Sequence, residues 1–183
     1  NEFNDIRMYM EVASFAMSNE TFVNDLKGNS VGYNREFKGL NLRRTVFKQL
    51  ISAVAYIHEL SVWHMDIKPR NVLVFKGGVK LADFGTSIAY AQESAKNTFH
   101  VQTIWWRAPE VLTKCIYGAK VDMWSVGIMM LESIDGYRGH ICEGGDVDQL
   151  KALIKLVGYP PQEYEGVDNT PFASLKEKHK IGE

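Results

Sequence analysis

The chain has 183 residues, of which 45% are hydrophobic and 11% aromatic, so it can bury the core of one domain. Its 21 lysines and arginines nearly balance its 22 aspartates and glutamates, for a formal net charge of −1. This balance argues against nucleic acid or an anionic membrane surface as the main partner.

The first part of the chain predicts a strand, a short helix, a loop and a long helix. Residues 6–12 alternate loosely between apolar and polar side chains and indicate a strand that leads into a connector. Residues 18–26 indicate a short helix, and residues 27–39, rich in glycine and asparagine, a loop. From Asn41, a candidate N-cap, apolar residues recur at helical spacing to about Glu59. These apolar residues are Val46, Phe47, Leu50, Ile51, Val54 and Ile57.

The second part predicts a hairpin, a long loop and two helices. Short apolar runs at 72–75 and 79–82 flank a Lys-Gly-Gly turn, which is typical of a β-hairpin. Residues 86–104 are polar and irregular over a length that suggests a functional loop. Residues 121–132 are apolar on nearly every face and predict a buried helix. A last helix is expected from Asp146, as its cap, to a stop at Gly158. The fold class is therefore mainly α with a small β-hairpin.

Three short motifs follow one another in the order that phosphoryl transfer would require. Residues 64–71 have the sequence HMDIKPRN, residues 83–85 the sequence DFG and residues 108–110 the sequence APE. The first places a carboxylate, a lysine and an amide at fixed intervals, and the second adds a carboxylate after a predicted strand. Transfer of a phosphoryl group needs a positioned nucleophile, neutralised negative charge and bound metal ions, which such groups supply.

These motifs make the chain resemble the C-terminal lobe of a eukaryotic-type protein kinase, and the resemblance covers nearly all of it. It implies part of an α+β two-lobe kinase domain, with residues 1–17 as the last strand of the N-terminal lobe and the hinge, and residues 18–183 as the C-terminal lobe. A glycine-rich phosphate loop and a Val-Ala-Ile-Lys-like strand are missing from the sequence. We therefore expect an incomplete domain that is inactive by itself.

The resemblance assigns a role to each polar residue of the motifs. Asp66 would accept or orient the proton of the substrate hydroxyl, and Lys68 would contact the γ-phosphate of ATP. Asn71 and Asp83 would bind Mg²⁺ through oxygen atoms, the ligands that this cation prefers. The hydroxyl of Thr103 would bridge Asp66 and Lys68.

The nucleotide contacts implied by the resemblance lie near the start of the chain and on the predicted hairpin. Met10 would be the gatekeeper, the backbone of Glu11 and Ala13 would face adenine, and Leu73 would form the floor of the pocket. For Met10 and Leu73, an ordinary position in the core is the alternative.

Two further runs are similar to the cyclin-dependent and MAP kinase group. Residues 103–110 resemble its T-x-W-Y-R-A-P-E run, with Trp106 in place of tyrosine, and residues 145–160 resemble its G-D-x-x-D-Q-L … L-G-x-P pattern. In the protein kinase family, Lys-Pro at 68–69 marks kinases of serine and threonine rather than of tyrosine. Membership of the cyclin-dependent and MAP kinase group would further imply substrates with Ser or Thr followed by Pro.

The chain departs from the group's pattern at two arginines. Met65 and Ile88 stand where related kinases carry the guanidiniums that bind a phosphothreonine of the activation loop. Phosphorylated Thr98 would then lack its usual docking partners. Asp122 resembles the buried carboxylate that ties down the catalytic loop, which is a structural rather than a catalytic role.

Three functions compete on the sequence alone. The first is a Ser/Thr protein kinase that acts on protein substrates, with the identity of any cyclin-like regulatory subunit left open. The second is a non-catalytic binding module that lacks the nucleotide-binding lobe, and the third a small-molecule kinase of related fold.

The two cysteines, Cys115 and Cys142, lack CxxC spacing, which favours free thiols in an intracellular protein of the cytoplasm or nucleus. The longest apolar stretch, residues 123–131, is about half of what a membrane-spanning helix needs, so no membrane partner is expected.

Overall fold

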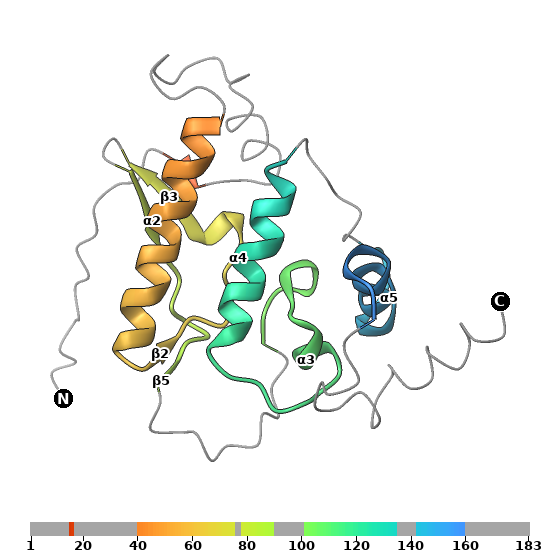
Figure 1. Cartoon of the computed structure of the whole chain (residues 1–183). Helices are drawn as coiled ribbons and strands as arrows, with labels where there is room; N and C mark the ends of the chain where they lie inside the picture. Colours follow the sequence, from red (N-terminus) through yellow and green to blue (C-terminus); the bar gives the residue numbers. More distant parts are fainter. Residues whose placement is uncertain (1–14, 17–39, 76–77, 90–100, 135–141, 160–183) are drawn as a thin grey trace, which may run out of the picture.

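A computed structural model describes residues 15–16, 40–75, 78–89, 101–134 and 142–159 of the chain (Figure 1). The strand predicted at 6–12, the helix at 18–26, the loop at 27–39 and most of the loop at 86–104 lie outside the described residues. The described part is mostly helical with a small antiparallel sheet, as the sequence predicts.

The two long central helices form where the apolar periodicity predicts them. Helix α2 covers Leu40–Glu59 and helix α4 covers Lys120–Glu132, and the two lie side by side in Figure 1 and contact each other. Helix α2 buries one stripe of apolar residues. Helix α4 buries most of its residues but exposes Met123, Gly127 and Met130 along one stripe, so the helix predicted as buried is buried only in part.

Two more helices lie on the other side of α4 and pack against each other. Helix α3 is the short segment Pro109–Leu112, and helix α5 covers Asp146–Val157. The cap of α5 is Gly145, so the prediction that Asp146 caps this helix is wrong by one residue. Asp146 lies in the first turn, where the helix dipole still favours a carboxylate. Gly158 ends the helix with a positive φ of 83°, as predicted.

The sheet is larger than the predicted hairpin. Strands β3 (Val72–Phe75) and β4 (Gly78–Leu81) pair antiparallel, with Val72 opposite Leu81, and β1 (Phe15–Ala16) adds a third strand beside β3. A second antiparallel pair joins β2 (Val62–Trp63) to β5 (Ile88–Ala89). Strands of two residues are too short to show a periodic pattern, which is why the sequence did not predict this pair.

Two groups of buried side chains hold the helices and the loops together. The larger joins α2, α4 and α5 to β3. The smaller is formed by Met65, Val101, Ala108, Val111, Tyr117 and Val121, and we call it the loop cluster. Because Met65 belongs to the motif at 64–71 and Val101 and Ala108 to the segment before α3, the loop cluster packs these two segments together against the start of α4.

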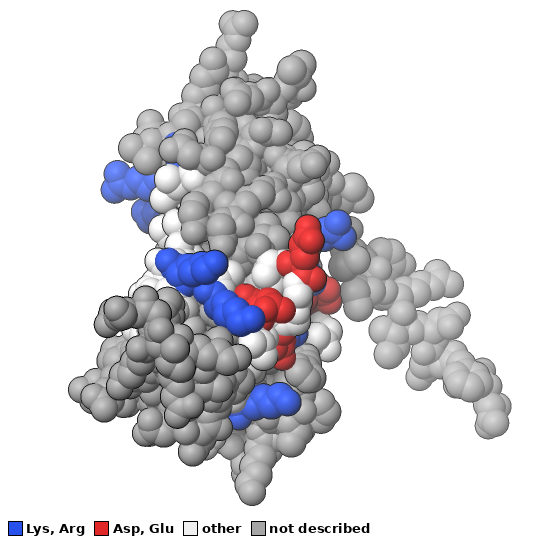
Figure 2. All heavy atoms as spheres, turned by 90° about the vertical axis from the view of Figure 1, so that its right-hand side faces the viewer, with Lys and Arg blue, Asp and Glu red and all other residues white. Residues whose placement is uncertain are grey.

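The surface of the described residues carries both charges. Figure 2 shows basic and acidic side chains interspersed on the face that it presents. On α5, for example, Lys151 lies 2.8 Å from Asp148 as an exposed ion pair. No helix in the described ranges has the length and apolar character needed to cross a bilayer.

A pair of neighbouring residues on α2 tests where the core lies. Leu50 is 1% exposed and Ile51 is 38% exposed. We expect Leu50→Ala to lower the free energy of unfolding by about 2–5 kcal/mol, because it leaves a cavity, and Ile51→Ala to lower it by less than about 1 kcal/mol. Urea unfolding of both variants measures the difference. Equal losses in the two variants would contradict the placement of α2.

Candidate active site

The backbone of the 64–71 motif is fixed by one carboxylate of α4. Asp122 is fully buried, and its Oδ2 accepts a hydrogen bond from the backbone N–H of His64 at 2.8 Å, while its Oδ1 accepts one from the N–H of Met65 at 2.9 Å. Nε2 of His58, near the end of α2, lies 2.9 Å from the same Oδ2. Asp122 therefore has the structural role that the sequence predicts, because it holds the backbone of the motif at His64 and Met65.

The side chain of His64 connects this motif to the segment before Asp83. Its Nε2 lies 2.9 Å from the carbonyl oxygen of Ala82, and its Nδ1 lies 3.2 Å from the backbone N of Asp66. A carbonyl can only accept and an N–H can only donate, so His64 is neutral with its proton on Nε2. The buried imidazole thereby fixes the turn at Asp66 relative to the strand end at Ala82.

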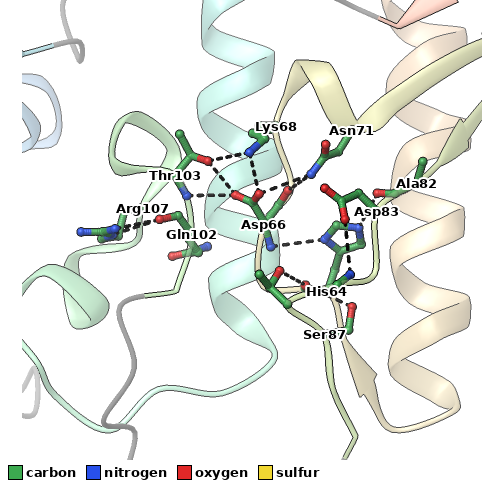
Figure 3. Close-up of polar contacts among 12 residues, drawn as sticks. His64, Asp66, Lys68, Asn71, Ala82, Asp83, Ser87, Gln102, Thr103 and Arg107 are labelled. Atoms are coloured by element: carbon green, nitrogen blue, oxygen red, sulfur yellow. Dashed lines mark hydrogen bonds and ion pairs between the residues drawn. The ribbon is translucent and has the colours of Figure 1, made fainter.

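Asp66, Lys68 and Thr103 form a close cluster of polar side chains (Figure 3). Oδ1 of Asp66 accepts hydrogen bonds from the backbone N of Thr103 at 2.9 Å and from its hydroxyl at 2.8 Å. Oδ2 of Asp66 forms an ion pair with Nζ of Lys68 at 2.6 Å, and the same Nζ donates to the Thr103 hydroxyl at 2.9 Å. The structure thus brings together three of the residues that the sequence singled out, from segments 35 or more positions apart.

The electrostatics of the cluster keep Asp66 ionised. Burial raises the pKa of the Asp66 carboxyl, but hydrogen bonds from Lys68 and Thr103 and the positive charge of Lys68 lower it by more, so the pKa lies below its ordinary value. A carboxylate of low pKa is a weak base, and it is better suited to orient a hydroxyl than to remove its proton early.

Asn71 lies on the same loop, at the end of a 3₁₀ turn that covers Pro69–Asn71. Its Nδ2 donates to the backbone carbonyl of Asp66 at 2.8 Å, so the amide is oriented with Nδ2 toward the loop. Its own backbone carbonyl accepts a hydrogen bond from the N–H of Ala82 at 2.9 Å, which places Asn71 beside the residue that precedes Asp83. Asp83 is exposed, and its Oδ1 accepts a hydrogen bond from the N–H of Gly85 at 3.4 Å.

This donor set suits a magnesium ion. With Nδ2 turned inward, the Asn71 amide has its carbonyl oxygen left to offer, and Asp83 offers a carboxylate. Oxygen ligands supplied by one or two side chains, completed by water and phosphate oxygens, are how proteins bind Mg²⁺.

The residues predicted to contact the nucleotide are placed only in part. Leu73 is half-buried on β3, opposite Ala16 on one side and Lys80 on the other. Its role as the floor of a nucleotide pocket stays a prediction. Met10, Glu11 and Ala13 lie outside the described residues.

Sequence reasoning missed two residues that shape the segment around Thr103. Gln102 is 6% exposed, and its carbonyl oxygen accepts hydrogen bonds from Nη2 of Arg107 at 2.8 Å and from its Nε at 3.3 Å. Nη1 of Arg107 forms an ion pair with Asp146 at 2.6 Å. Arg107 belongs to the run at 103–110 that resembles the T-x-W-Y-R-A-P-E pattern, and Gln102 directly precedes that run. Neither position shows in the sequence which partners the side chain will have in the fold.

The backbone is strained at three positions of the site. Met65, Asp83 and Gln102 have φ values of 66°, 64° and 65°, in the left-handed region that residues other than glycine rarely adopt. Asp83 is a predicted ligand of Mg²⁺. Met65 directly precedes Asp66, and Gln102 directly precedes Thr103. Such strain persists where surrounding contacts impose it, and it is concentrated at functional sites.

The loop at 64–71 presents a carboxylate, an ammonium group and an amide next to a second carboxylate, and these are the kinds of groups that phosphoryl transfer uses. Residues 4–163 of the chain match the family model of the protein kinase domain. The chain belongs to the protein kinase domain family.

Its relatives include kinases of the cyclin-dependent group. The chain is 38% identical to cyclin-dependent kinase 4 of Ovis aries over 121 residues, which are 66% of this chain and 39% of that protein. For cyclin-dependent kinase 4 of Xenopus laevis the identity is 38% over 128 residues, which are 69% and 40% of the two chains. A protein of Dictyostelium discoideum, named among the cyclin-dependent serine/threonine-protein kinases, is 40% identical over 129 residues, 68% of this chain and 19% of that protein. The chain thus spans about two fifths of the length of the cyclin-dependent kinase 4 relatives. These matches support the predicted resemblance to the cyclin-dependent and MAP kinase group.

The low pKa of Asp66 gives a prediction for stability as a function of pH. Because the pKa is lower in the folded state than in the unfolded state, ionised Asp66 contributes stability above the unfolded value of about 4, and this contribution is lost as the pH falls through the folded value. We expect the difference in unfolding free energy between the wild type and Asp66→Asn to shrink between about pH 7 and about pH 3. Urea unfolding of both proteins at both pH values measures this difference. The same difference at pH 7 and at pH 3 would contradict the contacts of Asp66 with Lys68 and Thr103.

Proposed function

We propose that the native protein containing this chain transfers the γ-phosphoryl group of ATP to serine or threonine hydroxyls of protein substrates. The observation that carries the proposal is the cluster of Asp66, Lys68 and Thr103, with Asn71 bound to the same loop. The family match supports phosphoryl transfer, and the resemblance at Lys68 and Thr103 supports serine and threonine as acceptors.

In the proposed mechanism, Asp66 binds the substrate hydroxyl and directs its oxygen toward the γ-phosphorus. That oxygen forms the new P–O bond as the bond to the leaving ADP breaks, and the hydroxyl proton passes toward Asp66 late in the step. Lys68 is held next to Asp66 and neutralises negative charge on the transferred group. Asn71 and Asp83 would hold Mg²⁺, which supplies further charge neutralisation on the phosphates when it is bound.

A proline after the acceptor residue is supported by the backbone next to Thr103. The carbonyl of Gln102 is already bound by two nitrogens of Arg107, so it is turned away from a peptide that lies along this segment. A substrate residue with an N–H at this position would lose a hydrogen-bond partner on binding, whereas proline has no N–H to lose. We therefore include Ser-Pro and Thr-Pro sequences in the proposed substrate class.

The relatives named above are cyclin-dependent by name, so a cyclin-type regulatory subunit is part of the proposal. For this reason the tests below use the full-length protein, wild type and variants alike, expressed in its source cells and purified with any subunit that accompanies it.

The proposal predicts that Asp66→Asn lowers kcat for a Ser-Pro peptide by about 10²–10⁴-fold with little change in KM. The amide has the shape of the carboxylate, but it lacks the negative charge that orients the hydroxyl. Transfer of radiolabelled phosphate from ATP in the presence of Mg²⁺ is the measurement. Glu59→Gln, an exposed carboxylate at the end of α2, is the matched control and should keep full activity.

Equal activity of wild type and Asp66→Asn would overturn the assignment of Asp66. A wild-type protein that transfers no phosphate but binds the peptide would favour the non-catalytic binding module over the kinase.

A further inference from the structure

The hairpin of β3 and β4 carries the two predicted magnesium ligands at its open end. Asn71 directly precedes β3, and Asp83 follows β4 after one intervening residue, Ala82. The backbone N–H of Ala82 donates to the carbonyl of Asn71 at 2.9 Å, so the pairing of the two strands continues to this end. The position of Asp83 relative to Asn71 therefore depends on which residues of β3 and β4 lie opposite each other.

The turn sequence does not determine this register by itself. The structure pairs Phe75 with Gly78, after a connection of two residues. The sequence Lys-Gly-Gly at this place suits turns of more than one length, and glycine-rich strands specify their pairing weakly. A longer connection would pair Phe75 with Lys80 and shift Asp83 along the hairpin by two residues, about 7 Å. Such a shift keeps each side chain on its own face of the sheet, so the apolar alternation in the two strands is compatible with both registers.

Gln49 of α2 fits only the register that the structure shows. Its side chain is half-buried, and its Oε1 accepts a hydrogen bond from the N–H of Val79 at 2.9 Å, where α2 packs against β4 (Figure 1). A Cβ at Gly78, where φ is 144°, would lie 2.8 Å from Cδ of Gln49, so only glycine leaves room for this amide. In the shifted register Lys80 would bring a Cβ to the same place. Gln49 would then have to move away and lose its hydrogen bond to the backbone.

We propose that Gln49 is a positioning residue that selects the register of the β3–β4 hairpin and thereby holds Asp83 beside Asn71 for Mg²⁺. The hydrogen bond from Val79 keeps the Gln49 amide in place, and the amide excludes every residue but glycine from the position opposite Phe75. This inference rests on the proposed function, because it concerns the metal ion that the reaction needs. It assigns the placement of a ligand to a side chain of α2 that does not itself bind the metal.

Engineered disulfides report the register directly. Val74 lies opposite Val79, and because the N–H of Val79 points to Gln49, the two form a non-hydrogen-bonded pair, whose close Cα atoms suit a disulfide. With a mild oxidant, Val74→Cys and Val79→Cys should cross-link in the wild-type background and in Gln49→Ala. Val74→Cys and Leu81→Cys lie opposite each other only in the shifted register, so their cross-linking should rise several-fold in Gln49→Ala. Peptide mass mapping measures both yields, and no rise for the second pair would overturn the proposal.

Binding of Mn²⁺, which replaces Mg²⁺ and is detected by electron paramagnetic resonance, measures the consequence for the metal ligands. The full-length protein is titrated with Mn²⁺ in the presence of a non-hydrolysable ATP analogue. We expect the apparent Kd for Mn²⁺ to rise about twofold or more in Gln49→Ala, because only the molecules in the register of the structure offer both ligands. An unchanged Kd in this variant would overturn the role of Gln49 in metal binding.

Two further variants separate this role from a general loss of stability. Gln49→Glu keeps the length of the side chain and an oxygen acceptor, so the Kd for Mn²⁺ and the cross-linking yields should match those of the wild type. Ser52→Ala is the matched control on the same helix, because Oγ of Ser52 is exposed and donates to the carbonyl of Lys48 at 2.9 Å. It should leave both measurements unchanged. A Kd raised in Ser52→Ala as much as in Gln49→Ala would show a general effect of α2 and overturn the proposal.

The outcomes distinguish this inference from the proposed function. A wild type that binds Mn²⁺ but transfers no phosphate contradicts the kinase proposal, and the Kd of Gln49→Ala still decides the role of Gln49. A wild type that transfers phosphate, with the same Kd for Mn²⁺ in Gln49→Ala, overturns the role of Gln49 alone. A wild type that binds no Mn²⁺ overturns the assignment of Asn71 and Asp83 as ligands, and the role of Gln49 with it.

Discussion

The buried carboxylate of Asp122 is the constraint on which the site depends. A charged group removed from water is costly unless hydrogen bonds satisfy it, and here two backbone N–H groups and the imidazole of His58 surround it. If the N–H groups of His64 and Met65 moved away, the buried carboxylate would lose two of its three hydrogen-bond partners. Asp66 follows them directly, so the position of Asp66 is set by helix α4.

Helix α4 also binds the segment that carries Thr103. Through the carbonyl of Val121 and the hydroxyl of Ser125, α4 binds Gln102, and near its end Glu132 accepts a hydrogen bond from the indole N–H of Trp106 at 2.9 Å. The cluster of Asp66, Lys68 and Thr103 therefore lies where two loops meet, and both loops are anchored to α4. This arrangement keeps Asp66, Lys68 and Thr103 in contact although two of them come from one loop and the third from the other.

The sequence predicted those parts of the structure that leave a periodic or motif signal. The helices at 40–59 and 120–132 follow from apolar spacing, and Asp66, Lys68, Asn71 and Thr103 from short motifs. The partners of Gln102 could not be predicted, because a polar residue in an irregular loop bonds according to the tertiary fold. The sequence did not predict the pairing of β2 with β5, because strands of two residues are too short to show an alternation of apolar and polar side chains.

Hydrogen exchange at the N–H groups of His64 and Met65 tests most directly whether Asp122 fixes the site. In the wild type these two amides should exchange among the slowest of the loop at 62–71, because their acceptor is fully buried. In Asp122→Asn one oxygen acceptor becomes an NH₂ donor, so at least one of the two amides loses its partner and its exchange should rise by about 100-fold. Exchange that stays slow at both amides in Asp122→Asn would contradict the account.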